Sequence, residues 1–379
     1  MNKKTIQLFT PHFEIDECLA EMRICLEKGW TGIGFKTNEF EKLFSKYIDQ
    51  PYCHFVNSNT NGIHLIMEML KKTRGWRDGD EIISTALTFV STNHSILNAN
   101  LVPIFADVDD SLCMTLENIS KKISNKTKAI IFVAIGGNSG EIEEISSFCK
   151  KNNLVFILDA AHSAGSKLKG KDLSHYADYS IYSFQAVKNL PTADSGLITV
   201  KTEKEDELVR QLSWCGINKD TYARSKDGYK WLYAVDEIGY KYNGNSLMAA
   251  IAIVQLRHLD EGNSRRRAIA KQYKSKLSHL NEFKFIDHSN ENESSRHLIQ
   301  FILPNGEKRN KLIEYLDQND IGTGVHYRSN ARYPMYANNH TPYSNSLDER
   351  IVSLPCHLHL SDEDIDYVVT KIEEFSKLI

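Results

Sequence analysis

The segment Val155-Phe156-Ile157-Leu158-Asp159-Ala160-Ala161-His162 decides how the rest of the chain is interpreted. Its four consecutive apolar residues are typical of a strand that is buried on both faces of a parallel sheet. Six further short apolar runs lie in the first 200 residues, and helical patterns such as 40–48 and 62–71 alternate with them: 54–56, 81–83, 102–105, 129–133, 179–182 and 196–200. This alternation predicts an α/β domain whose mostly parallel, seven-stranded sheet is flanked by helices.

The pattern changes after residue 239. A long helical stretch begins at 246 and continues beyond 270, and strand-like runs follow at 283–286 and 297–303. Helical patterns at 308–318 and 362–377 complete a smaller C-terminal α+β domain. We place the boundary near residue 255, which gives a large domain over 1–255 and a small domain over 256–379.

Composition excludes several classes of protein. The formal net charge of -3 over 379 residues argues against a dedicated nucleic-acid binder, which usually presents a basic face. The seven cysteines are scattered without a CxxC pair, so neither a metal site nor a disulfide framework is indicated. No export signal or membrane-spanning apolar run is evident, and unpaired thiols favour the cytoplasm.

Two residues of this α/β pattern suggest a reaction. Asp159 ends the apolar run 155–158, and Lys188 follows the run 179–182 within a few residues. Burial or a cationic neighbour lowers the pKa of a lysine amine and makes it a nucleophile, and a strand-end carboxylate can keep a pyridine nitrogen protonated. An imine anchor and an electron-sink partner are what a pyridoxal phosphate (PLP) enzyme requires. The ordinary alternatives are a solvated lysine and a surface-loop acid.

Other loops at the carboxyl ends of the strands carry compatible residues. The loop 57–62 opens a helix with small polar residues, so its backbone N–H groups and the helix dipole favour a phosphate, although a plain helix cap is the alternative. Phe89, in the loop 86–92, has the flat ring needed to stack on a cofactor, although a lone phenylalanine is more often part of the core. In doubly wound sheets, ligands bind where such loops meet.

Taken in order, these motifs resemble those of the DegT/StrS family of PLP-dependent nucleotide-sugar aminotransferases, which have the type I fold of PLP enzymes. The likeness covers nearly the whole chain. The segments that carry it are 29–34, 58–60, 88–89, 103–108, 159–162, 183–188, 239–243, 249–250, 255–256, 325–327 and 353–355.

The resemblance implies a role for each residue around the cofactor ring. Lys188 would hold PLP covalently and then act as the general base and acid that moves the proton. Asp159 would pair with the protonated ring nitrogen. Phe89 would stack on one face of the ring, and His162 would lie near its other side or its O3′ edge.

The resemblance also implies how the phosphate and the sugar are held. The backbone amides of Asn59 and Thr60, with the hydroxyls of Thr60 and Ser183, would bind the phosphate. Asn243, with Lys241, would reach the phosphate of a neighbouring subunit, which implies a homodimer with shared active sites. In the same way, the residues implied to lie near the sugar are His326 and Tyr327.

The expected reaction moves an amine from L-glutamate to a nucleotide-linked keto-sugar. Our specific expectation is C4 of a TDP-4-keto-6-deoxyhexose, which gives a 4-amino-4,6-dideoxyhexose of the viosamine type for O-antigen or another surface polysaccharide. Amination at C3 of a 3-keto isomer uses the same fold and is the alternative. Two further alternatives are a sugar dehydratase, in which histidine replaces the lysine, and a non-catalytic relative, which would be expected to lose Asp159 or Lys188.

The chain departs from the usual family pattern at three places. Asn59 stands where the family commonly has glycine, and Gln185 stands where it often has histidine. The segment 192–196 reads TADSG instead of the usual TGEGG. These departures leave the chemistry of Lys188 intact and bear on the contacts with the substrate.

Overall fold

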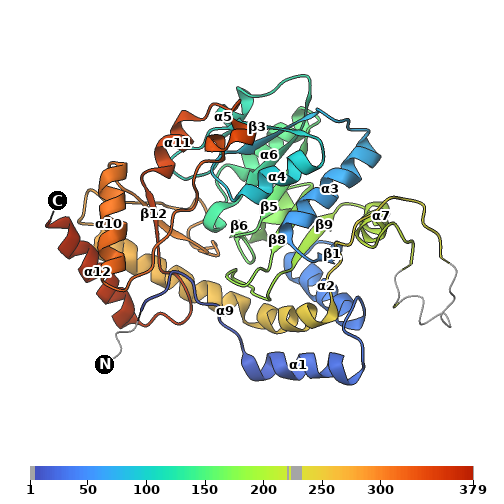
Figure 1. The fold of residues 1–379 in the computed structure, drawn as a ribbon, viewed down its shortest axis with the longest axis horizontal. Coiled ribbons are helices and arrows are strands. Elements are labelled where there is room, and N and C mark those ends of the chain that lie inside the picture. Colours follow the sequence, from blue (N-terminus) through green and yellow to red (C-terminus); the bar gives the residue numbers. More distant parts are fainter. Residues whose placement is uncertain (1–4, 220–221, 223–232, 379) are drawn as a thin grey trace.

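A seven-stranded sheet forms the centre of the computed structural model, which describes residues 5–219, 222 and 233–378 (Figure 1). The strand order is β1-β9-β8-β5-β4-β2-β3, and within this sheet β9 alone runs antiparallel to its neighbours. The prediction of a mostly parallel sheet is therefore confirmed. In chain order the strands are β1 (Tyr52–Val56), β2 (Glu81–Thr85), β3 (Val102–Ala106), β4 (Thr127–Val133), β5 (Val155–Ala160), β8 (Tyr179–Ser183) and β9 (Gly196–Val200).

Alternate side chains of the central strands enter two separate cores. On β4, Ile130 and Phe132 pack into one apolar cluster, whereas Ala129 and Ile131 pack into the other. This period of two is expected for a strand that is covered on both faces. Helices α2 (Phe35–Ile48), α6 (Ile142–Lys151) and α9 (Ser246–Leu277) contribute to the first core, and α3 (Asn59–Arg74), α4 (Val90–Asn98) and α7 (Glu203–Ser213) to the second.

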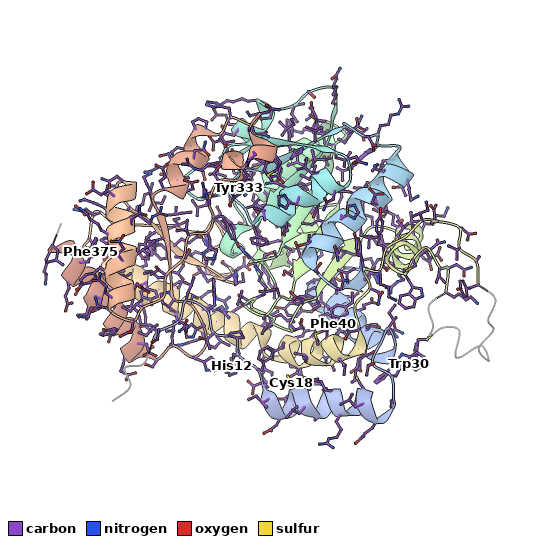
Figure 2. All side chains as sticks on the ribbon, viewed as in Figure 1. His12, Cys18, Trp30, Phe40, Tyr333 and Phe375 are labelled. Atoms are coloured by element: carbon purple, nitrogen blue, oxygen red, sulfur yellow. The ribbon has the colours of Figure 1, made fainter. Side chains whose placement is uncertain are left out.

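Aromatic rings fill the space between α2 and the sheet. The ring centroid of Phe40, which is labelled in Figure 2, lies 5.1 to 5.7 Å from those of Phe44, Phe55 and Phe184. The tilted and edge-to-face arrangements of these rings are favourable. Phe184 directly follows β8 and begins the loop that carries Lys188, so this aromatic core fixes one end of that loop.

Helix α9 joins the sheet to the C-terminal part of the chain. It packs against α1 (Ile15–Glu27) and α2 near its beginning and against α12 (Asp362–Ser376) further along, as Figure 1 shows. Ala249 and Ile253 belong to the core of the large sheet, whereas Ile269 and Tyr273 belong to a separate C-terminal core. The helix is unbroken through residue 255, and the domain boundary there stays a prediction.

The C-terminal part contains a small antiparallel sheet and its helices. Strands β10 (Lys284–Phe285), β11 (Ile299–Ile302) and β12 (Ile351–Leu354) form the sheet, and helices α10 (Gly306–Gln318), α11 (Pro342–Asp348) and α12 accompany it. The remaining elements are α5 (Leu116–Ser120), the hairpin of β6 (Lys167–Leu168) and β7 (Lys171–Asp172), and the short turns η1 (Ile135–Gly137), η2 (Leu173–Tyr176), η3 (Asn330–Arg332) and η4 (Pro334–Tyr336). Among the described residues, no helix combines the length and the apolar character needed to cross a membrane.

Two helices begin earlier than their apolar pattern predicts. The pattern places the start of α2 at residue 40 and that of α3 at residue 62, whereas the helices start at Phe35 and Asn59. Because the first turns of both helices contain mostly polar residues, the apolar periodicity does not show where the helices start. The Ser58 hydroxyl accepts a hydrogen bond from the backbone N–H of Asn61 and so caps α3.

Candidate active site

A cavity of about 440 Å³ opens at the carboxyl ends of β5 and β8. This volume lies within the range of small-molecule sites in proteins. Nine of the eleven predicted site residues line it: Asn59, Thr60, Phe89, Asp159, His162, Ser183, Lys188, His326 and Tyr327. The structure therefore brings together residues that lie far apart in the sequence.

The amino end of α3 faces this cavity because two glycines let the helix approach the sheet. A β-carbon at Gly62 would lie 2.8 Å from a side-chain methyl of Ile181 on β8, and one at Gly196 would lie 2.8 Å from the backbone nitrogen of Asn59. The first N–H groups of a helix have no partner within the helix, and the dipole makes this end positive. The cavity wall at Asn59 and Thr60 therefore suits the phosphate of a cofactor.

Asp159 lies at the end of β5, with 3% of its surface exposed. Its Oδ1 accepts hydrogen bonds from Asn59 Nδ2 (3.1 Å) and from the backbone N–H of Ala161 (3.1 Å), and its Oδ2 accepts one from Thr92 Oγ1 (2.8 Å). Burial raises the pKa of this carboxyl group above its ordinary value, while the three donors and the nearby Lys188 oppose that rise. Thr92 was missed in the sequence, where a threonine in the loop 86–92 carries no distinguishing signal.

Lys188 stands on a loop that local hydrogen bonds hold in shape. Its backbone N–H donates to the carbonyl of Gln185 (2.8 Å), and Gln185 Oε1 accepts from the N–H of Val187 (3.0 Å). At the base of the loop, Thr192 Oγ1 donates to the carbonyl of Phe184 (2.8 Å). Gln185 thus stabilises the turn that presents the lysine.

Burial also sets the protonation of Lys188. Desolvation lowers the pKa of its amine from 10.5 to about 8, and the negative charge of Asp159 partly opposes this shift. Below the pKa the amine is an unreactive ammonium, and above it the amine is a free nucleophile. We therefore expect the rate of PLP capture by the cofactor-free protein to rise with pH, with a midpoint of about 8. Stopped-flow absorbance over a pH series would measure this rate, and a midpoint near 10.5 would contradict it.

A directed chain of hydrogen bonds ends at Tyr327. The backbone N–H of Gly136 donates to His162 Nδ1 (3.2 Å), so the proton of the neutral imidazole resides on Nε2. This Nε2–H donates to the Tyr327 hydroxyl (3.0 Å), which leaves the hydroxyl's own proton available to a ligand in the cavity. Burial holds the pKa of His162 well below its usual value, in agreement with a neutral ring. Both ring nitrogens of His162 are thus engaged within the protein.

Phe89 and His326 complete the wall. Phe89 is 57% exposed, and its ring centroid lies 6.1 Å from that of Tyr327, so its face remains available at the cavity surface. His326 Nδ1 lies 2.9 Å from Ser353 Oγ, and burial lowers the pKa of His326 to about 4. His326 is therefore neutral at physiological pH.

Lys241 and Asn243 lie outside this cavity. They form isolated bridges with Trp214 and Val56, respectively, beyond the edge strand β1. Asn243 lines a separate cavity of about 360 Å³ that also contains His54. The role predicted for these two residues in the site of a neighbouring subunit stays a prediction.

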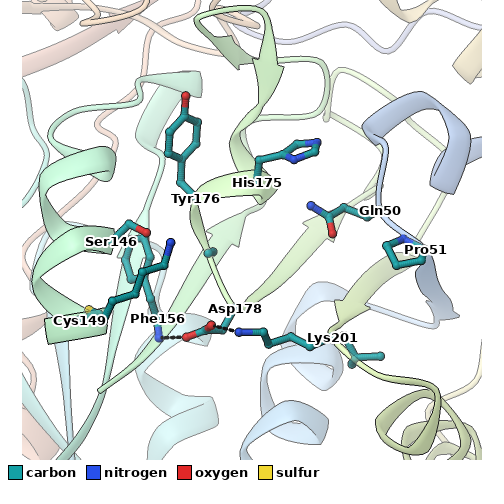
Figure 3. A pocket seen from close by; sticks show the side chains of 12 residues that line it. Gln50, Pro51, Ser146, Cys149, Phe156, His175, Tyr176, Asp178 and Lys201 are labelled. Carbon is teal, nitrogen blue, oxygen red and sulfur yellow. Dashed lines mark hydrogen bonds and ion pairs between the residues drawn. The ribbon is translucent and has the colours of Figure 1, made fainter. Parts of the chain in front are cut away.

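A further cavity lies at the opposite, amino-terminal edge of the strands (Figure 3). Asp178 there pairs with Lys201 and accepts a hydrogen bond from the N–H of Phe156 (2.9 Å), and His175 Nε2 lies 3.0 Å from a backbone carbonyl oxygen. These polar groups already have protein partners. Within the described residues, no group of three or more histidine, cysteine, aspartate or glutamate side chains is placed to hold a metal ion.

Known proteins match the chain over almost its full length. The family model described as the DegT/DnrJ/EryC1/StrS aminotransferase family matches residues 13–373. The chain is 32% identical to the uncharacterized protein MJ1066 of Methanocaldococcus jannaschii, covering 97% of both chains. It is 30% identical to the spore coat polysaccharide biosynthesis protein SpsC of Bacillus subtilis, covering 95% of both.

Solved structures give the same result. The crystal structure of the sugar aminotransferase CalS13 from Micromonospora echinospora superposes with a TM-score of 0.88 at 25% identity, covering 97% of this chain and 99% of that one. The half-buried lysine, the strand-end acid and the helix amino end also fit PLP, which such enzymes bind through a lysine and an acid at the ring nitrogen. The chain belongs to the DegT/DnrJ/EryC1/StrS aminotransferase family and is a PLP-dependent aminotransferase.

Proposed function

We propose that this protein is a sugar aminotransferase that moves an amine from L-glutamate to C4 of a nucleotide-linked 4-keto-6-deoxyhexose. The observation that carries the proposal is that Lys188, with its lowered pKa, and the buried Asp159 line one cavity. Support for a sugar acceptor comes from the likeness to CalS13 and to SpsC, whose names refer to a sugar and to a polysaccharide. A TDP-linked acceptor and a viosamine-type product for a surface polysaccharide are our specific proposal.

Each residue of the cavity would have a separate role in the reaction. When bound, PLP supplies a ring that accepts electrons as the bond between hydrogen and the amine-bearing carbon breaks. The neutral amine of Lys188 takes this proton and later returns it, while ionised Asp159 holds the proton on the ring nitrogen. The amino end of α3 holds the phosphate, and the Tyr327 hydroxyl offers a hydrogen bond to the substrate.

Incubation with defined substrates tests the proposal. The purified protein with PLP would be mixed with L-glutamate and either a TDP- or a UDP-linked 4-keto-6-deoxyhexose, and NMR would locate the new amine. We expect 2-oxoglutarate and an amine at C4 of the TDP sugar. An amine at C3 of a 3-keto isomer would replace the C4 assignment, and failure of glutamate to convert the bound cofactor to its amine form would contradict transamination.

We further infer that the enzyme acts as a homodimer in the cytoplasm. All seven cysteines are free thiols, as a reducing compartment favours. Ile15, Leu19 and Leu26 follow a helical spacing that places them on one face of α1, and they are 67%, 57% and 61% exposed in the single chain. An apolar stripe of this kind favours contact with a second subunit.

Subunit mixing tests the shared sites. If Asn243 contributes to the active site of the partner subunit, Lys188→Ala affects the site of its own subunit, whereas Asn243→Ala affects the site of the partner. Where Asn243→Ala alone is inactive, random reassortment of the two variants makes half of the dimers mixed, each with one intact site, and restores about a quarter of the wild-type rate. Lys188→Ala mixed with Asp159→Asn is the control, since both residues serve the same subunit's site, and no recovery is expected there. Failure of the first mixture to recover would contradict a shared site.

A further inference from the structure

The side chain of Asn59 makes two hydrogen bonds in the wall of the Lys188 cavity. Its carboxamide is buried, with 7% of the residue exposed. Asn59 Nδ2 donates to Asp159 Oδ1 (3.1 Å) and to the backbone carbonyl of Ile181 (2.9 Å). Ile181 is the register partner of Asp159 across the β5–β8 pair, so the carboxamide ties the carboxylate to the adjacent strand.

The other donors to Asp159 leave one acceptor position open. A carboxylate offers about four lone-pair sites, two on each oxygen. Asn59 and Ala161 occupy both sites on Oδ1, and the Thr92 hydroxyl occupies one on Oδ2. Because the Thr92 hydroxyl donates its only proton to the carboxylate, the hydroxyl of Thr88 must be the donor in the 3.0 Å hydrogen bond between the two threonines. The remaining site is on Oδ2, in a residue that lines the Lys188 cavity.

We propose that Asn59 is a positioning residue that orients Asp159 so that one lone pair of Oδ2 receives the N–H of the cofactor ring. This inference rests on the use of PLP, and it goes beyond the proposed function by assigning a role to Asn59. The carboxamide acts in two ways. It blocks rotation of the carboxylate about its last bond, and it adds a donor that favours the ionised form of a buried acid.

Removal of the carboxamide should weaken the contact between Asp159 and the ring nitrogen of PLP. The other contacts of the cofactor should not change. The experiment measures dissociation constants of the apoprotein for PLP and for an analogue in which a C–H replaces the ring nitrogen. For Asn59→Ala we expect PLP to bind about tenfold more weakly, since one hydrogen bond to a charged group is lost. Binding of the carbon analogue should change less than about twofold, because it has no ring N–H for Asp159 to hold.

Comparison of the two ligands distinguishes a role of Asn59 in orienting Asp159 from a general loss of structure at the site. Loss of structure at the amino end of α3 would weaken both ligands equally, and such an equal loss would overturn the proposal, as would unchanged PLP binding. Asn59→Gly gives a second variant with the more usual residue and should behave as Asn59→Ala does. Thermal unfolding of both apoproteins checks that they fold.

Asn118→Ala is the matched control. Its carboxamide also lies in the first turn of a helix and donates to a backbone carbonyl, that of Asp107 at 3.2 Å, but it does not line the cavity. Its affinity for both ligands should equal that of the wild type. Failure of the wild type itself to bind PLP would overturn the proposed function and this inference together, whereas equal effects on the two ligands in Asn59→Ala would overturn this inference alone.

Discussion

Lys188→Ala is expected to abolish amine transfer. Loss of a positioned general base alone slows a proton transfer by roughly 10² to 10⁴-fold, and the variant also loses the covalent anchor of the cofactor. Lys188→Arg should be equally inactive, because a guanidinium stays protonated and cannot attack the aldehyde of PLP. Single-turnover conversion of the bound cofactor by glutamate measures this loss. The purified wild type should be yellow.

Chemical trapping identifies the lysine independently of turnover. Borohydride reduction of the wild type with PLP, followed by peptide mass spectrometry, should place the adduct on Lys188, and the alanine variant should give none. Lys169→Ala is the control, since that lysine is two-thirds exposed and pairs with Glu143 outside the cavity. A reducible adduct on another lysine in an active Lys188→Ala variant would overturn the assignment. In the cofactor-free protein, where desolvation disfavours the charged amine of Lys188, removal of this amine should not lower the thermal unfolding temperature.

The site residues that could be predicted lie next to short apolar runs of sequence. The run that ends at Asp159 and the run that precedes Lys188 both have the apolar character of buried strands, and parallel strands bring their carboxyl ends together. The contacts that tune Asp159 were not predictable in this way. Thr92 and Asn59 are 67 and 100 residues away from it, and nothing in either local pattern shows where its side chain points.

Two missed elements have similar causes. Helix α7 is rich in charge, and its buried apolar residues are few, so apolar periodicity does not reveal it. A better signal was Thr202, whose hydroxyl accepts from the N–H of Glu205 in a capping box. Strand β12 has only four residues, and its pairing with β11 spans about fifty residues of chain. Long-range pairing of so short a strand leaves no periodic pattern to detect.

Asp159→Asn is expected to slow amine transfer by roughly 10² to 10⁴-fold. Removing one partner of a buried ion pair typically costs about 3–5 kcal/mol, and each 1.36 kcal/mol is about tenfold in rate. The loss should fall on single-turnover conversion by glutamate. Asp172→Asn is the matched control, because Asp172 is also a buried acid whose pKa burial raises, but it bonds to Tyr182 outside the cavity. We expect Asp172→Asn to change the free energy of unfolding far more than the rate of amine transfer.

The surrounding donors explain why so small a change at Asp159 should be so damaging. The two donors at Oδ1, Asn59 and Ala161, repel an NH₂ group, so the amide of Asp159→Asn must place its oxygen there and its NH₂ at the Oδ2 position. That NH₂ would donate to an unprotonated ring nitrogen and so stabilise the wrong protonation state. Asp159→Ala allows the charge on the ring nitrogen to be tested without the contact from the carboxylate. The smaller side chain leaves room for a PLP analogue that is methylated on the ring nitrogen, and this analogue carries a permanent positive charge. Partial recovery of the alanine variant with this analogue is expected, and equal activity with both cofactors would contradict the role of Asp159 as the partner of a charged ring.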